Sequence, residues 1–304
     1  MNEQNFLNTI FPMLNQGEDV VVGPGDDCAA VDMGDSENYL LLAVDQLIST
    51  VHFDPSNTNP EEAGAKLINR NISDIASMGG VPMHALVTIA VGSQDLDWIT
   101  LFYRGLSREA DKWNISICGG DVASLPKSEN FISTLSITGK VKRNNICLRK
   151  NGQAGDLLFA TGVYGNSYPT HHHLNFKPRV KEAAFLAPMF TNTMMDISDG
   201  LLLDVQRMAE ASNVTIMLSL DAIPGRTTSL PVENILSDGE DYELIFTIKP
   251  SLEQRLLMEW PFKDVSLTKI GEIMSFDNRS IIDQNGDDLL KKYLKKGYDH
   301  FIKK

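Results

Sequence analysis

The sequence predicts a mixed α/β protein built from two domains, and three observations support this prediction. The chain has 304 residues, which is more than a single hydrophobic core usually organises. From about Tyr39, apolar strand-like segments alternate with segments of helical periodicity. Residues 142–156 are basic, polar and glycine-containing, as linkers between domains often are. We therefore expect a first domain over residues 1–145 and a second over residues 146–304.

Strands and helices alternate through the first expected domain. Residues 1–15 carry apolar side chains at helical spacing, which predicts an amphipathic helix. Asn59 and Pro60 predict the start of a second helix, because they supply an N-cap followed by proline at the first helical position, and Gly79 marks its end. The last strand, residues 131–141, alternates apolar residues with Ser and Thr and should be half-buried. Further strands are expected at 39–44, 84–91 and 115–118, and a further helix at 95–113.

The second expected domain continues this alternation after the linker. Strands are expected at residues 157–161, 214–220 and 242–248, and a helix should begin near Asp199-Gly200. Asn285-Gly286 predicts a β-hairpin over residues 280–289, because this dipeptide suits a two-residue hairpin loop. The histidines at 171–173 lack the spacing of a helical zinc site, so we expect them in an exposed loop, with adventitious metal binding as the alternative.

Composition excludes several classes of function. Lys plus Arg number 27 against 40 Asp plus Glu, a net charge of −13 that disfavours nucleic acids and anionic membranes as partners. No apolar run approaches the roughly 18 residues needed to span a bilayer, and the N-terminus lacks the basic start of a signal peptide. The three cysteines are too widely spaced for a disulfide framework or a Cys-x-x-Cys metal site. We therefore expect a cytoplasmic protein.

Aspartates stand beside glycine or serine in several expected turns next to strands. These turns are residues 25–27, 119–121, 196–200 and 238–241, and Asp45 and Asp74 follow apolar stretches. Scattered carboxylates suit Mg²⁺, which also keeps water or phosphate ligands, and neighbouring glycines let backbone N–H groups approach phosphates. Together the turns predict a magnesium and phosphate site. Taken singly, each is also explained by ordinary turn chemistry or helix capping.

Two further patterns bear on this hypothesis. Lys66, Arg70 and Asp74 recur every fourth residue on one face of the expected helix, either as a solvated ladder of ion pairs or as part of a site. The chain lacks the Walker-type glycine-lysine loop, the Gly-x-Gly-x-x-Gly fingerprint and the His-Arg-Asp signature of protein kinases. The common ATP-binding folds are therefore disfavoured.

A set of ordered motifs resembles the thiamine-monophosphate kinase family. They are Gly25-Asp26-Asp27-Cys28-Ala29, Val51-His52-Phe53, Asn71-Ile72-Ser73-Asp74-Ile75-Ala76-Ser77-Met78-Gly79, Gly119-Gly120-Asp121, Asp196-Ile197-Ser198-Asp199-Gly200-Leu201, Gly239-Glu240-Asp241-Tyr242-Glu243-Leu244 and Lys296-Gly297-Tyr298-Asp299-His300-Phe301. The resemblance implies an aminoimidazole ribonucleotide synthetase-like fold. In that fold an N-terminal sheet domain dimerises with a second copy, and a C-terminal α/β domain completes a cleft for ATP and metals.

The resemblance also implies a reaction and roles for residues. ATP and thiamine monophosphate would give ADP and thiamine diphosphate by in-line transfer with several Mg²⁺ ions, and the ionised phosphate acceptor needs no strong general base. The implied metal ligands are Asp27, Asp45, Asp74, Asp121, Asp196 and Asp199. Gly120, Asp121, Lys150 and Ser198 would contact ATP, while His52, Glu240 and Tyr298 would hold thiamine.

The chain departs from the family pattern at three places. Ala43-Val44 stands where Ser-Thr is usual, which predicts the loss of two hydroxyl ligands near one metal. Lys150 stands where arginine is usual, although neighbouring Arg149 could replace it. Around Gly165-Asn166-Ser167 the segment is shortened, and a helix before the three histidines is expected to be missing.

These departures leave alternatives to the kinase. One is another ATP-dependent member of the same superfamily, although selenophosphate synthetase is disfavoured because the N-terminus has no early cysteine. The other is a non-catalytic relative that binds nucleotide or thiamine phosphate, favoured by Ala43-Val44 and the shortened segment.

Overall fold

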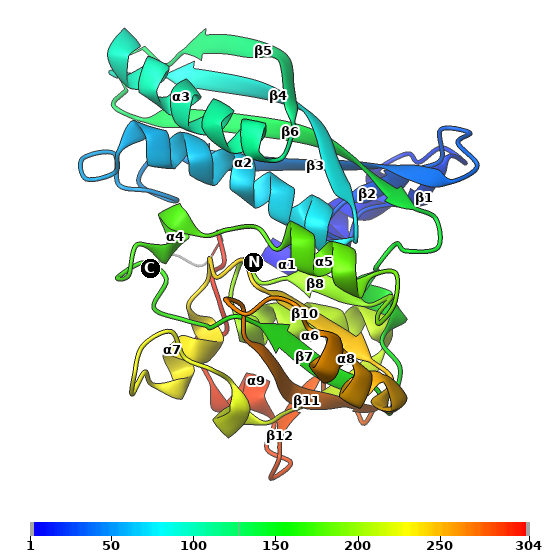
Figure 1. Ribbon diagram of the computed structural model, residues 1–304. Coiled ribbons are helices and arrows are strands. Elements are labelled where there is room, and N and C mark those ends of the chain that lie inside the picture. The colour runs from blue at the N-terminus through cyan, green and yellow to red at the C-terminus, as the bar shows by residue number, and fades with distance from the viewer. Residues whose placement is uncertain (1–2, 127, 302–304) are drawn as a thin grey trace.

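A computed structural model describes residues 3–126 and 128–301, and in this part of the chain the strands form two six-stranded sheets (Figure 1). The N-terminal sheet has the order β1-β2-β3-β6-β4-β5 and the C-terminal sheet the order β12-β9-β11-β7-β10-β8. The mixed α/β prediction is therefore confirmed. The expected boundary at residue 145 falls between β6 and β7, and it stays a prediction because part of the core crosses it.

The N-terminal sheet is covered by helices on one face. Its strands are β1 (Val20–Val22), β2 (Ala29–Val31), β3 (Asn38–Ile48), β4 (Val81–Val91), β5 (Ser116–Ser124) and β6 (Phe131–Lys142). Helices α2 (Pro60–Ser77) and α3 (Leu96–Lys112) lie together on the same side of this sheet (Figure 1). The short helices α1 (Glu3–Ile10) and η1 (Phe11–Met13) precede it, and Met1 and Asn2 of the expected first helix lie outside the described residues.

Capping residues fix the ends of the two covering helices. The Asn59 side chain accepts a hydrogen bond from the Glu61 backbone N–H, and Gly79 just beyond α2 has a positive φ of 74°. Asp95 caps α3 by accepting from the Trp98 N–H at 2.8 Å. Both helices therefore begin and end where the sequence predicts.

The C-terminal sheet is assembled from strands that are distant in sequence. They are β7 (Leu157–Thr161), β8 (Met194–Asp196), β9 (Val214–Leu218), β10 (Leu244–Ile248), β11 (Leu267–Ser275) and β12 (Ile281–Asp283). Helix α6 (Leu201–Ser212) connects β8 to β9 along the chain and contacts both strands. The shorter helices are α4 (His172–Asn175), α5 (Val180–Leu186), α7 (Val232–Ser237), α8 (Glu253–Glu259) and α9 (Leu289–Lys292). Single 3₁₀ turns occur at η2 (Arg149–Asn151), η3 (Leu220–Ala222) and η4 (Pro250–Leu252).

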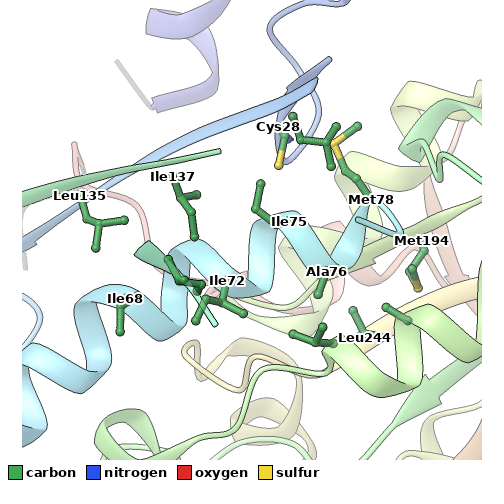
Figure 2. Close-up of a cluster of buried hydrophobic side chains, with 14 of the residues drawn as sticks. Cys28, Ile68, Ile72, Ile75, Ala76, Met78, Leu135, Ile137, Met194 and Leu244 are labelled. Atoms are coloured by element: carbon green, nitrogen blue, oxygen red, sulfur yellow. The ribbon is translucent and has the colours of Figure 1, made fainter. Parts of the chain in front are cut away.

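Helix α2 lies between the two sheets and belongs to the core of both. Figure 2 shows Ile72, Ile75 and Ala76 of α2 in one buried cluster with Ile137 of β6 and Met194 of β8. Apolar side chains therefore surround this helix on nearly all sides, which is the pattern of a fully buried helix. Its polar residues must consequently face either a partner side chain or a site.

One predicted element is wrong and another is only partly formed. Gly119-Gly120-Asp121 is not a turn after a strand but continues β5, where a Cβ on Gly120 would lie 1.6 Å from the Val87 carbonyl oxygen. The glycines therefore permit close pairing of β5 with β4. The predicted turn at Asn285-Gly286 is present, since the Asp283 N–H donates to the Asp287 carbonyl and Ile282 forms an antiparallel bridge with Asp288. The second side of this hairpin is not a strand, because the chain enters α9 at Leu289, and β12 pairs in parallel with β9.

No helix in the two described ranges is both long enough and apolar enough to cross a lipid bilayer.

Candidate functional site

Three elements bring polar side chains to the boundary between the two sheets. Helix α2 presents Lys66, Arg70 and Asp74 from successive turns of one face toward this boundary. Strand β8 ends at Asp196, and the loop before β10 carries Glu240. The contacts described below join all three elements, so the site lies between the two sheets.

Asp27, Asp74 and Asp196 form a carboxylate cluster at one end of this boundary. Each offers an oxygen within 4.8 Å of the others. Burial and the charges of neighbouring carboxylates raise the pKa values of Asp74 and Asp196 well above the usual range. The Ser73 hydroxyl donates to Asp196 at 2.5 Å, whereas the buried Oδ2 of Asp27 has no hydrogen-bond partner. The cluster therefore holds more negative charge than its surroundings compensate.

These residues fit a magnesium ion. Three converging carboxylates, one with an unpartnered buried oxygen, supply the hard oxygen ligands that Mg²⁺ prefers. A divalent cation would also remove the repulsion that raises the carboxyl pKa values. The donor set contains neither His nor Cys, which disfavours zinc.

Arg149 borders the cluster on the side of the linker. Its guanidinium pairs with Asp27 and lies 3.7 Å from Asp26, whose pKa burial and the neighbouring Asp27 raise to about 7. Lys150, the predicted ATP contact, is exposed on the adjacent residue. Arg149, the expected replacement for Lys150 as the cation at the site, is therefore the residue that faces the carboxylates.

The turn after β8 is organised by a buried carboxylate. One oxygen of Asp204 accepts hydrogen bonds from the backbone N–H groups of Ser198, Asp199 and Gly200 at 3.1, 3.1 and 3.2 Å. Arg207 donates to Asp204 at 2.6 Å and to Asp199 at 2.7 Å. The predicted residues Ser198 and Asp199 therefore lie on a fixed turn, next to the cluster residue Asp196.

Asp45 and Arg70 lie between the two ends of the site. The Asp45 carboxylate is 3.2 Å from the Arg70 guanidinium, which also donates to the Gln46 carbonyl at 2.6 Å. Burial raises the pKa of Asp45, and Arg70 opposes that shift. The preceding residues are split between the faces of β3, since Ala43 packs toward the core and Val44 is exposed on the other face. The two lost hydroxyls would therefore face opposite sides of β3, and their role at a metal site stays a prediction.

The opposite end of the site is a compensated pair of charges. Lys66, whose side chain is fully buried, donates to both carboxylate oxygens of Glu240 at 2.6 and 2.7 Å and to the His52 carbonyl at 2.6 Å. Burial lowers the pKa of Lys66 to about 8 even against the attraction of Glu240. Burial and the nearby cations lower that of His52 to about 2, so its imidazole is neutral. The ladder of solvated ion pairs considered for α2 is therefore wrong.

The C-terminal tail closes over this paired end. The Tyr298 backbone N–H donates to the Asp199 carbonyl at 2.8 Å. The His300 ring lies 4.8 Å from the Tyr298 ring and 5.8 Å from the His52 ring, measured between centroids. The three predicted thiamine contacts, His52, Glu240 and Tyr298, are thus gathered around Lys66 and His300.

Gly120 and Asp121 lie apart from this site. Asp121 is exposed on β5 and is paired in register with Thr88 of β4, on the face opposite to α2. Among the described residues, the carboxylates that converge are Asp27, Asp74 and Asp196, and Asp121 is not one of them.

The histidines at 171–173 do not form the expected exposed loop. His171 is exposed, but His172 starts α4 and is half-buried, and His173 is only 2% exposed. The His173 ring stacks on Tyr168 with centroids 4.0 Å apart. This segment packs against the loop that carries Glu240. That packing buries His173 and partly buries His172, although polar side chains of this kind are usually exposed to solvent.

Sequence reasoning missed Lys66, Arg149, Asp204 and His300 as assigned members of the site. For Lys66 a signal was present, because a helix that is apolar on nearly every face leaves its charged residues no solvated side. Asp204 and Arg207 look like an ordinary helical ion pair, and no sequence pattern separates them from one.

The chain is similar to one family of known proteins over most of its length. Residues 25–141 match the model of the family described as AIR synthase related protein, N-terminal domain. Thiamine-monophosphate kinase of Rhodopirellula baltica is 33% identical over 292 residues, covering 90% of this chain and 89% of that protein. The enzyme of the same name from Bacillus subtilis is 30% identical and covers 99% and 100% of the two chains.

Solved structures agree over almost the full length. The structure described as AaThiL complexed with AMPPCP and TMP superposes with a TM-score of 0.83 at 25% identity, covering 99% of this chain and 97% of that one. Thiamine-monophosphate kinase from Stenotrophomonas maltophilia K279a gives a TM-score of 0.74 at 26% identity, covering 94% and 97%.

Proposed function

This chain belongs to the thiamine-monophosphate kinase family and phosphorylates thiamine monophosphate at the expense of ATP, and we propose that its interdomain site does so by direct in-line transfer. An oxygen of the acceptor phosphate forms a bond to the γ-phosphorus of ATP. The bond from that phosphorus to the β-phosphate oxygen breaks, and ADP leaves. The observation that carries this proposal is that the carboxylate cluster and the Lys66–Glu240 pair, with the aromatic rings beside it, lie at the same boundary between the two sheets.

In this proposal the carboxylate cluster holds the phosphate end of the reaction. Asp27, Asp74 and Asp196 would ligate Mg²⁺, which supplies charge neutralisation of the phosphate chain. Asp45 and Asp199 would be further ligands, and each carboxylate is paired with an arginine in this structure. Arg149 contributes a permanent cation at the same place, and Lys150 and Ser198 would contact ATP from the linker and from the turn after β8.

The charge-paired end would bind thiamine. Tyr298 offers a ring to stack on a cationic heterocycle, and Glu240 a carboxylate for its charge or amine. His52 accepts the Ile48 N–H at Nδ1, so its neutral ring carries a proton at Nε2 that it can donate to a ligand. The acceptor oxygen is already ionised, so the reaction needs no general base here.

We also propose that the enzyme is a homodimer located in the cytoplasm. Leu42, Val44 and Leu86 are 39%, 61% and 52% exposed on the face of the N-terminal sheet that the helices leave open. Asp121 lies on this same face, and Gly120 precedes it on β5. A second copy packed there would cover the apolar residues and could bring Asp121 and Gly120 to its partner's cleft. The cytoplasmic location is supported by buried free thiols at Cys28 and Cys147.

The decisive assay uses the purified chain with ATP, Mg²⁺ and thiamine monophosphate. Thiamine diphosphate and ADP should form in equal amounts, and chelation of Mg²⁺ should abolish both. Binding of both substrates without turnover would instead identify a binding protein. ADP formation without thiamine diphosphate would mean that the site acts on a different acceptor.

The shared site can be tested by mixing two inactive variants, Asp121→Asn and Asp196→Asn. If Asp121 serves the partner's site, random pairing restores about a quarter of the activity, since half of the pairs are mixed and each mixed pair has one intact site. If both residues serve the same chain's site, mixing restores nothing. Asp121→Asn with unaltered activity would show that Asp121 has no role.

A further inference from the structure

The turn that carries Glu240 has a strained backbone. This glutamate turn (residues 239–242) holds Glu240 at φ 64° and Tyr242 at φ 50°, both in the left-handed region that non-glycine residues seldom adopt. Such conformations persist only when the surroundings enforce them, and they concentrate at ligand-binding positions. Here the conformation directs Glu240 away from its own sheet and onto Lys66 of α2.

A second segment holds the turn from outside. This histidine loop (residues 165–173) makes hydrogen bonds to the turn itself. The Ser167 hydroxyl donates to the Gly239 carbonyl at 2.5 Å, and the His172 ring bonds the Asp241 carbonyl through Nε2 at 2.8 Å. The Gly165 N–H also donates to both carboxylate oxygens of Asp241 at 3.1 Å.

The bond from His172 has a defined direction. A carbonyl oxygen only accepts, so Nε2 of His172 must carry the proton and donate it. Burial lowers the pKa of His172, so the ring stays neutral and keeps this tautomer. The carbonyl that it holds belongs to Asp241, which lies between the two left-handed residues, so the bond restrains the peptide that joins Asp241 to Tyr242.

We propose that His172 is a positioning residue for thiamine monophosphate binding, which acts by fixing the Asp241 carbonyl and thereby aiming the Glu240 carboxylate at the substrate site. This inference rests on the proposed role of Glu240. It assigns a role to His172, one of the three histidines expected in an exposed loop. Ser167 supports the same turn one residue before Glu240.

The test compares His172→Phe, which keeps a ring but loses the donor, with His172→Gln, whose amide can donate again. His172→Phe should raise the KM for thiamine monophosphate by about 3- to 30-fold, the scale of one lost hydrogen bond, and leave the KM for ATP unchanged. His172→Gln should restore most of the affinity. The matched control is His171→Phe at the exposed neighbour, which should leave both constants unchanged.

A double variant shows whether His172 acts through Glu240. If it does, Glu240→Gln combined with His172→Phe should have the KM for thiamine monophosphate of Glu240→Gln alone. Multiplied effects of the two substitutions would overturn the inference. So would equal increases in both KM values with a lowered Tm and no rescue by glutamine, which would indicate a general structural role.

Failure of this inference is distinguishable from failure of the proposed function. If Glu240→Gln leaves the KM for thiamine monophosphate unchanged, the proposed substrate role of Glu240 is wrong. If Glu240→Gln raises it and His172→Phe does not, only the inference about His172 is wrong. Should His172→Phe not fold, Ser167→Ala removes the neighbouring contact to the same turn and should raise the same constant.

Discussion

The two ends of the interdomain site treat buried charge in opposite ways. At the paired end, Lys66 neutralises Glu240 through two short hydrogen bonds, so the protein itself completes the charge balance. At the cluster end, Asp27, Asp74 and Asp196 converge, Arg149 pairs with Asp27, and the pKa values of Asp74 and Asp196 stay raised. Removing one partner from a buried charge pair is costly, whereas an uncompensated cluster gains by binding a cation. The paired end is therefore balanced without a ligand, whereas the cluster end would gain from the metal and phosphate that we propose it binds.

Asp196→Asn gives the sharpest test of the cluster and the largest expected effect. It removes one carboxylate from a set of three, and the turnover number should fall at least about 100-fold with a raised Mg²⁺ requirement. Steady-state kinetics over a Mg²⁺ titration measure both quantities. Asp221→Asn, at an exposed carboxylate, is the control and should change neither. Normal turnover at low Mg²⁺ would mean that the cluster is structural.

At the proposed thiamine end, we expect a substitution to cause a smaller loss of affinity, for thiamine monophosphate alone. Tyr298→Ala should raise the KM for thiamine monophosphate by about 2- to 30-fold, the scale of one cation–π contact, and leave the KM for ATP nearly unchanged. If Tyr298 were instead a core residue, its loss would cost about 3–5 kcal/mol and lower the Tm together with ATP affinity. Both Michaelis constants and the melting temperature of this variant decide between these outcomes.

Melting temperatures should also separate the two ends by their response to pH. The folded-state pKa values of Asp74 and Asp196 are raised, so the folded chain retains protons that the unfolded chain releases. Stability without metal should therefore fall as the pH rises above the usual carboxyl range. Mg²⁺ displaces these protons, so the increase in Tm that it causes should be a few degrees larger near pH 8 than near pH 5.5. An increase independent of pH, or one retained in Asp196→Asn, would place the metal elsewhere.

The smallest expected effects concern Ala43 and Val44, which lie on opposite faces of β3. If the open face of the sheet meets a partner's cleft, Val44→Thr should lower the Mg²⁺ concentration for half-maximal activity by a few-fold, because a hydroxyl suits a hard cation. Ala43→Ser should leave it unchanged, since Ala43 packs against the core. If Ala43→Ser lowers this concentration and Val44→Thr does not, the hydroxyl acts in the site of its own chain.

The sequence predicted elements that local chemistry determines. Asn59, Pro60 and Gly79 bound α2 correctly because capping and termination depend on neighbouring residues. The three-residue strands β2 and β8 were missed because so short a segment shows no periodicity. The hairpin at Asn285-Gly286 has only one antiparallel bridge, because β12 pairs along its length with β9, more than sixty residues earlier.

The sequence predicted several individual residues of the site but not the long-range contacts between them. The ordered motifs named Asp27, Asp74 and Asp196, and the structure brings these three together. They did not show that Lys66 crosses to Glu240, 174 residues away in the chain. Nor did they show that Asp121 faces away from the cluster, since that depends on which face of β5 the helices cover. Long-range pairing of this kind is set by tertiary packing and leaves no local pattern.

Because Lys66 and Asp74 project from the same helix, α2 fixes the distance between the two ends of the site. Eight residues at 1.5 Å each set a separation of about 12 Å along the helix axis. A ligand must span this length to place a ring beside Lys66 and a phosphate beside Asp74 at the same time. Selection by molecular length thus follows from helical rise alone, and one residue inserted between Lys66 and Asp74 would rotate one end by about 100° relative to the other.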